Sequence, residues 1–289
     1  MLQDKIDGVY EISRPAHAAW LVFDSPHSGR DYPADFNHKI PEALMNEYED
    51  SLVDDLFEAV PENGGVFLKA LFPRTYIDAN RDEDDIKRDM VADPENWPLG
   101  FNPTYRSDQG HGLIRETLYG KGPRVYSQPL AAQDIMQRVT KYHRPYHQAL
   151  RGLIDEGLAA YGQVWHINCH SMPSACVMTG HKTDFCLGDA FGKACSREDL
   201  TKIVEEMLQD MGYRVSMNFP FAGGKLVTDY ADPAHGLQSL QIEINKAIYW
   251  DEDKDHPSRD YDRVKRDIST LSERLVTYTG QHLMRMAAD

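Results

Sequence analysis

The chain has 289 residues, of which 41% are hydrophobic and 27% are charged, and its formal net charge at pH 7 is −15. These values are typical of one large or two small globular domains. No apolar run approaches the ~20 residues that a membrane helix needs, and the acidic balance disfavours a nucleic-acid surface. The N-terminus lacks a basic head followed by an apolar core, so we expect no signal peptide.

The four cysteines give no sign of a metal knuckle or a disulfide framework. Cys169, Cys176, Cys186 and Cys195 are spaced 7, 10 and 9 residues apart. None of them forms a CxxC pair, which both kinds of site commonly use. We therefore expect a protein of the reducing cytoplasm.

The first half of the chain predicts strands and helices in alternation. The predicted elements are a strand (18–24), a helix (41–60), two strands (66–71 and 75–79) and a long helical stretch (128–162). Apolar residues recur at helical spacing in 41–60, and Pro145 is expected to kink or divide the long stretch. Residues 82–112 are acidic and contain scattered Pro, Asn and Gly. They predict a long surface excursion, for which a lid is one interpretation.

The second half continues the alternation. The predicted elements are a strand (163–171), a strand with a turn (183–190), a helix (196–212), a strand (213–218), a Gly-interrupted loop leading to a hairpin-like piece (219–231), a strand (237–249) and a final amphipathic helix (258–286). Strands separated by helices indicate a mostly parallel sheet that is covered on both faces.

Two of the predicted strands end in a histidine, His27 in "SPHSG" and His170 in "NCHSMPS". Parallel neighbouring strands would bring the two imidazoles to one edge of the sheet, where α/β proteins bind ligands. A hydrogen-bonded structural role is the alternative for each. Among the carboxylates of the helix after His27, Asp50 lies close to the apolar stripe, although a solvated acidic face is the alternative. Two histidines and one carboxylate form the ligand set of a catalytic zinc hydrolase.

The strand 237–249 carries a candidate catalytic carboxylate. Gln241, Glu243 and Asn245 alternate with apolar residues and therefore share one face of the strand. A carboxylate in such a segment is costly unless it is paired or has a chemical task. We favour a task over a buried salt bridge. Glu243 would take a proton from activated water and later pass it to a leaving amine.

The order of motifs resembles that of the N-formylglutamate amidohydrolase family, which belongs with the zinc carboxypeptidase-like hydrolases. The matching pieces are "SPHSGRDYP", the Asp50–Asp54 pair, "RTYIDANR", "GLIR", "YHRPYH", "NCHSMPS", "NFPFAGG" and "LQIEINKAIY". They span nearly the entire chain in the expected order. The resemblance implies an α/β fold: a single domain over residues 1–289 around a central mixed, mostly parallel sheet flanked by helices. It also implies hydrolysis of an N-acyl amino acid, such as N-formyl-L-glutamate, to formate and glutamate.

The resemblance also implies roles for individual residues. His27, Asp50 and His170 would bind Zn²⁺ or another divalent metal, and Glu243 would be the general base. The helix-to-strand spacing of the family favours Asp50 over Asp54 as the third ligand, but the choice between the two stays open.

Five further residues are implied to bind the substrate: Arg81, Arg115, Asn80, Gln241 and Gly224. The guanidinium fork suits bidentate pairing with substrate carboxylates. An ion pair with Asp78 or another nearby acid is the alternative for Arg81, and capping or bracing of the long helix is the alternative for Arg144. A turn that needs a positive φ is the alternative for the glycine pair Gly223–Gly224.

Some features leave the substrate open. Asp229 stands where the pattern calls for a basic group, and the excursion at 82–112 is acidic. A related zinc deacylase, a carboxypeptidase-like peptidase and a non-catalytic protein that binds an amino-acid derivative are the alternatives. Ser28, Ser171 and Cys169 lie beside the key histidines, but the chain has no GxSxG elbow for a nucleophile.

The expected setting follows from the same resemblance. The partner is a small N-acyl amino acid, with neither nucleic acid nor membrane involved. We expect a cytoplasmic monomer or small homo-oligomer that acts in histidine degradation.

Overall fold

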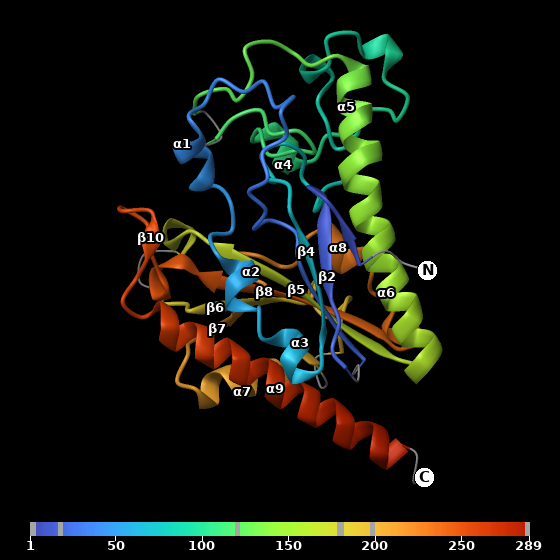
Figure 1. Ribbon diagram of the computed structural model, residues 1–289, viewed down its shortest axis with the longest axis vertical. Coiled ribbons are helices and arrows are strands. Elements are labelled where there is room, and N and C mark those ends of the chain that lie inside the picture. The colour runs from blue at the N-terminus through green and yellow to red at the C-terminus, as the bar shows by residue number, and fades with distance from the viewer. Residues whose placement is uncertain (1–3, 17–19, 119–121, 178–181, 197–199, 287–289) are drawn as a thin grey trace. The chain divides into compact units, whose positions relative to one another are not determined.

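The computed structural model describes residues 4–16, 20–118, 122–177, 182–196 and 200–286 (Figure 1). Residues 18 and 19 of the predicted first strand and residues 197–199 of the predicted helix 196–212 lie outside this set. Two compact units are formed by the described chain. The first unit contains the residues up to Glu11, Pro26–Glu49 and Ala70–Ala149, and the second contains Ile12–Ser25, Asp50–Lys69 and the chain from Leu150. The single-domain organisation stays a prediction.

A mixed eight-stranded sheet in the order β1-β2-β4-β3-β5-β8-β6-β7 is the main structural element. Its strands are β1 (Lys5–Ile6), β2 (Tyr10–Ser13), β3 (Leu21–Ser25), β4 (Val66–Ala70), β5 (Val164–Met172), β6 (Phe185–Gly188), β7 (Val215–Met217) and β8 (Leu237–Asn245). The pairs β3–β4, β3–β5, β5–β8 and β6–β7 are parallel, whereas β6–β8 and β1–β2 are antiparallel. The prediction of an α/β fold with a mixed, mostly parallel sheet is confirmed. The sequence pattern gave no indication of β1 and β2.

The central strands β3, β5 and β8 separate apolar from polar side chains between their two faces. Trp165, Ile167 and Cys169 of β5 belong to the apolar core. The side chains between them alternate to the other face, as strand geometry requires. That face carries the buried polar residues Asp24, His166, Asn168, His170, Ser239, Gln241 and Glu243. The polar face therefore carries the candidate functional residues, while the apolar face forms part of the hydrophobic core.

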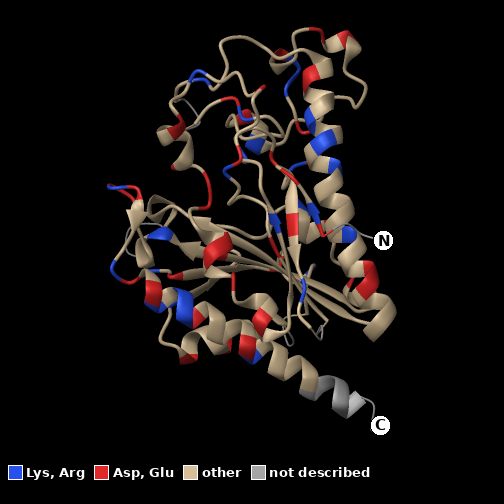
Figure 2. Ribbon diagram, in the orientation of Figure 1, with Lys and Arg blue, Asp and Glu red and all other residues tan. Residues whose placement is uncertain are grey.

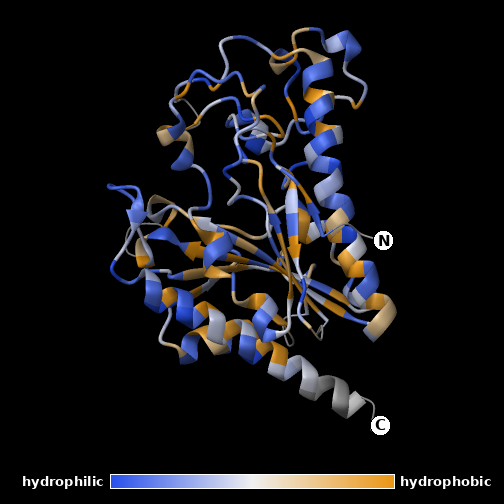
Figure 3. Cartoon of the chain, in the orientation of Figure 1, coloured by the Kyte–Doolittle hydropathy of each residue, from blue (hydrophilic) through white to orange (hydrophobic). Residues whose placement is uncertain are grey.

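Helices of the second unit cover the apolar face. The helices that contribute buried residues to this core are α2 (Val53–Leu56), α3 (Val60–Asn63), α7 (Lys202–Asp210) and α9 (Tyr261–Met286). Figure 1 shows α7 and α9 on the same side of the sheet. Hydrophilic and hydrophobic residues alternate along α9 (Figure 3), and both signs of charge lie along it (Figure 2). The predicted amphipathic helix at 258–286 is confirmed.

The predicted helix at 41–60 is wrong, because the chain forms three short helices there: α1 (Glu42–Asn46), α2 and α3. The break includes Leu52, whose φ of 54° lies in the left-handed region. Glu49 within the break accepts hydrogen bonds from the backbone N–H of Arg74 and the hydroxyl of Thr75. These tertiary contacts outweigh the local helical preference. Asp50 consequently lies in the irregular segment and not on a helix.

Two further predictions about local structure are wrong. Residues 75–79 form turns instead of a strand. The segment 219–231 contains a helical turn, α8 (Lys225–Thr228), in place of a hairpin-like piece. In both segments short-range turn geometry replaces the extended backbone that the residue pattern suggested.

The long helical stretch is present as one continuous run over 132–161, in which a π-helical turn interrupts the α-helical geometry just before Pro145. It consists of α5 (Ala132–Arg138), a π-helical turn (Val139–His143) and α6 (Arg144–Tyr161). Pro145 has no N–H for the helical ladder, and the wider turn immediately before α6 accommodates this loss.

The excursion at 82–112 contains only short helical turns, which are η1 (Arg88–Met90), η2 (Pro94–Asn96) and α4 (Tyr105–Asp108). It is more than a surface loop, because Asp85, Met90 and Trp97 are buried. The Asp85 carboxylate accepts hydrogen bonds from the backbone N–H and the hydroxyl of Thr104. Whether the segment acts as a lid stays a prediction.

The remaining short elements are η4 (Ser174–Cys176), η6 (Pro233–His235), η7 (Lys246–Ile248), and the paired strands β9 (Trp250–Asp251) and β10 (His256–Pro257). None of the helices in the described ranges is long and apolar enough to span a membrane.

We expect Leu271→Ala in α9 to lower the free energy of unfolding by about 2–5 kcal/mol, because the side chain is buried in the core of the second unit and its removal leaves a cavity. Urea denaturation measures the change. Glu273→Ala on the exposed side of the same helix is the control and should change the free energy by less than about 0.5 kcal/mol. Equal effects of the two substitutions would contradict the assignment of Leu271 to the core.

Candidate metal centre

His170 lies on the polar face of β5, near the carboxyl end of the strand, and is buried. Its Nδ1 lies 2.8 Å from Oδ2 of Asp50, and its Nε2 lies 2.7 Å from Oδ1 of Asn168. Both partners are also buried. The imidazole is therefore held between two oxygen atoms, one on each ring nitrogen.

His27 lies on the loop that follows β3 and is held by a second carboxylate, Asp78. The Nε2 atom of His27 is 2.7 Å from Oδ1 of Asp78, which also accepts a hydrogen bond from the backbone N–H of Asn80. Arg74 forms an ion pair with the other oxygen of Asp78 at 3.2 Å. Burial acts to raise the pKa of Asp78, but His27, Arg81 and Arg74 outweigh it and hold the pKa well below its usual range. Asp78 is therefore an ionised acceptor for His27.

A glycine next to His27 packs closely against the neighbouring backbone. A Cβ atom on Gly29 would lie 2.4 Å from the carbonyl carbon of Leu71 and 2.4 Å from the carbonyl oxygen of Phe72. No other residue fits at this position without displacing backbone. Gly29 of "SPHSG" thus lets the loop that carries His27 pack directly against the backbone of Leu71 and Phe72, which fixes the position of the loop.

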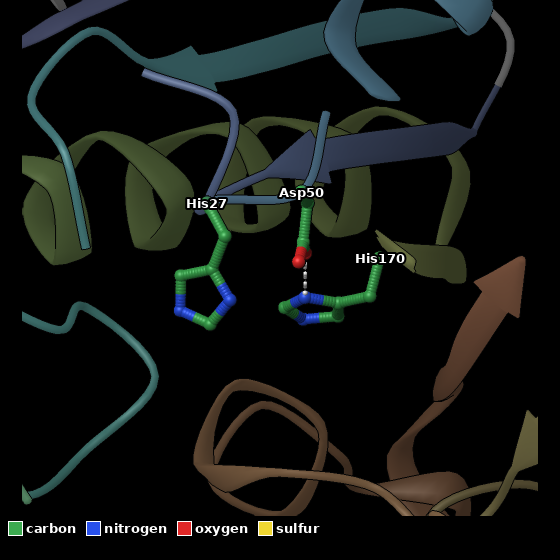
Figure 4. Close-up of side chains that lie close together, drawn as sticks. All are labelled: His27, Asp50 and His170. Carbon is green, nitrogen blue, oxygen red and sulfur yellow. Dashed lines mark hydrogen bonds and ion pairs between the residues drawn. The ribbon is translucent and has the colours of Figure 1, made fainter. Parts of the chain in front are cut away.

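The structure brings His27, Asp50 and His170 together, as Figure 4 shows. Each offers one ligand atom, and these three atoms all lie within 4.8 Å of one another. All three residues are buried. Asp54, the alternative third ligand, is not part of this group.

The residues present fit a divalent metal ion. Two imidazoles and a carboxylate are the three protein ligands of a catalytic zinc site, in which a fourth position serves water or substrate. Metal-binding histidines commonly hold an oxygen acceptor through the other ring nitrogen. His27 has Asp78 in this position, and His170 has Asn168.

Glu243 lies opposite His170 on the neighbouring parallel strand, because the two residues are paired in the register of β5 and β8. Gln241 donates a hydrogen bond from Nε2 to Oε1 of Glu243 at 2.8 Å. The backbone N–H of Gly224 donates in turn to Oε1 of Gln241, also at 2.8 Å. Gly223 has a φ of 114°, so the turn alternative applies to Gly223. These bonds fix the orientation of the Glu243 carboxylate.

Arg81 is engaged with backbone carbonyl groups. Its Nε donates to the carbonyl of His111 at 2.8 Å and its Nη1 donates to the carbonyl of Asn80 at 2.6 Å. The ion pair that the sequence suggested between Arg81 and Asp78 is formed by Arg74 instead. Arg81 thereby braces the turn that carries Asn80.

Arg115 is buried, with its guanidinium 5.9 Å from the centre of the Tyr48 ring. Burial and the neighbouring charge of Arg74 lower the pKa of Arg115 to about 9. The same environment lowers the pKa of His111 to about 3, through burial first and then through Arg115 and other guanidinium groups. Such a cluster favours the binding of an anion, because a carboxylate would relieve the repulsion between the cations.

Two other charged residues have local partners. Arg144 forms a bidentate pair with Glu83, at 2.8 Å for both contacts, in agreement with the bracing alternative. Asp229 forms an ion pair with Lys225, one helical turn earlier in the chain. A basic group therefore lies beside the acidic residue that departs from the family pattern.

Sequence reasoning missed several buried polar residues near the candidate ligands. Asp24, His166 and Asn168 form a hydrogen-bonded group on the polar face, and Asp78 holds His27. The alternation of polar and apolar residues in "HINCHS" was a usable signal for this face. Asp78 belongs to the matching piece "RTYIDANR", but no periodic pattern indicated its contact with His27, because Asp78 lies in an irregular segment.

Comparisons with known proteins identify the family of the chain. The family model described as N-formylglutamate amidohydrolase matches residues 19–250. An N-formylglutamate deformylase of Pseudomonas putida is 26% identical over 237 residues, which cover 80% of this chain and 82% of that protein. The solved structure of an N-formylglutamate amidohydrolase from Ralstonia eutropha JMP134 has a TM-score of 0.90 and 35% identity, covering 95% of this chain and 99% of that chain.

A gene product of Agrobacterium tumefaciens shares the fold, with a TM-score of 0.64 at 13% identity and 96% coverage of both chains. The family match extends over most of the sequence and includes all three candidate ligands and Glu243. The chain belongs to the N-formylglutamate amidohydrolase family.

Proposed function

We propose that this protein hydrolyses the formyl amide of N-formyl-L-glutamate, with a divalent metal ion, most simply zinc, held by His27, Asp50 and His170. The observation that carries the proposal is the group of three ligand atoms within 4.8 Å in a chain of this family. The in-register position of Glu243 opposite His170, on the adjacent strand, supports the assignment of Glu243 as the general base.

The chemistry divides between the ion and the protein. A bound zinc ion would supply Lewis-acid activation of water and of the amide carbonyl. Glu243 accepts a proton from the attacking water while the water oxygen forms a bond to the formyl carbon. Glu243 then returns this proton to the amide nitrogen as the C–N bond breaks. Formate and glutamate leave, and the carboxylate of Glu243 is restored.

The residues beside the base act mainly by positioning. Gln241 holds one oxygen of Glu243, and the N–H of Gly224 holds Gln241. This arrangement fixes the rotamer of the base before substrate arrives, as efficient proton transfer requires. We therefore assign Gln241 and Gly224 to the orientation of Glu243 instead of direct substrate contact.

We assign the binding of the substrate carboxylates to arginines of the first unit. Arg115 is buried beside other cations, which makes a carboxylate its natural partner. Arg81 and Asn80 form one braced turn, in which Arg81 donates to the Asn80 carbonyl. We assign Arg115 to direct recognition of a substrate carboxylate, with Arg81 and Asn80 shaping the same region.

Three parts of the expected setting stay predictions: the cytoplasmic location, the oligomeric state and the place in histidine degradation.

We expect His27→Ala and His170→Ala each to lose bound metal and most activity, because each removes one of three protein ligands. The measurement is the zinc content of purified protein, together with formate release from N-formyl-L-glutamate. Removal of metal from the unmodified protein by a chelator should abolish activity, and added zinc should restore it.

His256→Ala is the matched control, because His256 is exposed and its Nδ1 contacts only the carbonyl of Pro257 among the described hydrogen bonds. This variant should keep its metal and its activity. Full zinc content in both His27→Ala and His170→Ala would disprove the proposed ligand set.

Glu243→Gln is expected to keep the metal and to lower kcat by about 10²–10⁴-fold, because the amide cannot accept the proton. The change keeps the shape of the side chain and the oxygen that Gln241 holds. Steady-state kinetics and metal analysis on one preparation give both values. Glu252→Gln, at an exposed carboxylate that caps the N–H of Ser174, should be neutral. A fully active Glu243→Gln variant would refute the assignment of the base.

Arg115→Lys should raise KM for N-formyl-L-glutamate about 10–100-fold with a smaller effect on kcat, because lysine keeps the charge but loses the bidentate fork. Kinetics on N-formyl-L-glutamate and on acetyl and succinyl derivatives of glutamate test both the acyl group and the carboxylate contact. Arg124→Lys is the control, since Arg124 is exposed and forms an ion pair with Glu116. An unchanged KM in Arg115→Lys would exclude Arg115 from recognition.

A further inference from the structure

A buried hydrogen-bonded chain extends behind His170, away from Asp50. Nε2 of His170 lies 2.7 Å from Oδ1 of Asn168, and Nδ2 of Asn168 donates to Oδ1 of Asp24 at 2.7 Å. Asp24 and Asn168 have no exposed surface, and His170 is 3% exposed. All three side chains belong to the second unit, on the polar face of β3 and β5.

Asp24 determines which way the Asn168 amide points. A carboxylate only accepts hydrogen bonds, so the amide of Asn168 must turn its NH₂ group toward Asp24. Its oxygen atom then faces His170. Because an amide oxygen also only accepts, Nε2 of His170 must carry a hydrogen. This leaves Nδ1, the ring atom beside Asp50, as the nitrogen that can bind a metal ion.

We propose that Asp24 is a positioning residue for the metal centre, which acts through Asn168 to select the tautomer of His170 that binds metal through Nδ1. The inference rests on the proposed metal site and adds two residues to it. Neither Asp24 nor Asn168 is a candidate ligand, and Asp24 contacts His170 only through the intervening amide among the described hydrogen bonds.

A second contact fixes Asp24 in place. Nε2 of His166 lies 2.9 Å from Oδ1 of Asp24, and Nδ1 of His166 lies 2.7 Å from the hydroxyl of Ser239. A fully buried carboxylate is costly unless hydrogen bonds compensate it. His166 and Asn168 together supply this compensation. The carboxylate is therefore held rigidly enough to orient the amide.

The Ser239–His166–Asp24 arrangement is not a nucleophilic triad. All three side chains are buried with no exposed surface. A substrate cannot reach the Ser239 hydroxyl, so the group acts as a support for Asn168 and not as a second catalytic site.

The test measures metal affinity instead of activity alone. The dissociation constant for zinc is determined by competition with a chelator, and the visible absorption of the cobalt-substituted protein reports the ligand geometry. Asp24→Leu removes the acceptor, so the Asn168 amide is free to turn over. Loss of an outer partner of a ligating histidine typically weakens metal binding 10–100-fold, and we expect this range with an altered cobalt spectrum.

Asp24→Asn is the conservative variant. Its amide oxygen can accept the same hydrogen bonds from His166 and Asn168, so zinc affinity should stay within about threefold of the unmodified protein. Asn168→Leu removes the link itself, while Asp24 keeps its contact with His166. It should weaken zinc binding as much as Asp24→Leu, and it replaces that variant should Asp24→Leu fail to fold.

Asn245→Leu is the matched control for Asn168→Leu. Asn245 is a buried asparagine on the adjacent strand β8, and its amide contacts the carbonyl of Thr183 and the N–H of Ala247. This variant should lose stability in urea but keep the zinc affinity and the cobalt spectrum.

The outcomes separate this inference from the proposed function. If the unmodified protein binds no zinc or other divalent metal, the metal centre itself is wrong. If the unmodified protein binds zinc and the folded leucine variants bind it equally well with unchanged cobalt spectra, the positioning role is wrong. A loss of affinity in Asp24→Asn as large as in the leucine variant would also overturn the argument, because the acceptor would then not be the decisive feature.

Discussion

The two-residue period of strand β5 is the constraint on which the rest of the structure depends. Trp165, Ile167 and Cys169 point into the apolar core, and the alternation forces His166, Asn168 and His170 onto the other face. The parallel register with β8 then sets His170 opposite Glu243. A shift of one residue would exchange the two faces completely. The core therefore specifies the position of the candidate ligand and base, because the burial of apolar side chains fixes the register.

A polar face that is buried must satisfy its own hydrogen bonds. On this face the hydrogen bonds have a defined direction. Carboxylates only accept, amide groups donate through nitrogen and accept through oxygen, and each imidazole donates or accepts according to its tautomer. Asp24 orients Asn168, and Gly224 orients Gln241, which orients Glu243. The same bonds that make burial tolerable thus also preorganise the groups that the proposed chemistry needs.

The features that could be predicted from the sequence are those that leave a periodic residue pattern or an ordered set of motifs. The strand ending in His170 and the alternation around Glu243 follow from residue pattern, and the ordered motifs indicated the family. The break in the predicted helix at 41–60 could not be foreseen, because it depends on contacts of Glu49 with Arg74 and Thr75, which are distant in sequence. The contact of His27 with Asp78 was not predicted for the same reason. Asp78 lies in an irregular segment, and such a segment leaves no periodic pattern in the sequence.

The net charge of the protein acts on an anionic substrate at long range, whereas a buried arginine acts on it only at short range. The chain carries a charge of −15, which opposes the approach of an anionic substrate. At physiological ionic strength, however, interactions between exposed charges are largely screened beyond about 8 Å. A buried guanidinium is screened far less, and burial together with the neighbouring charge of Arg74 lowers the pKa of Arg115. If Arg115 binds a substrate carboxylate as proposed, discrimination in favour of that carboxylate would arise from the desolvated arginine and not from the overall field, and an acidic protein could bind an acidic substrate without electrostatic steering.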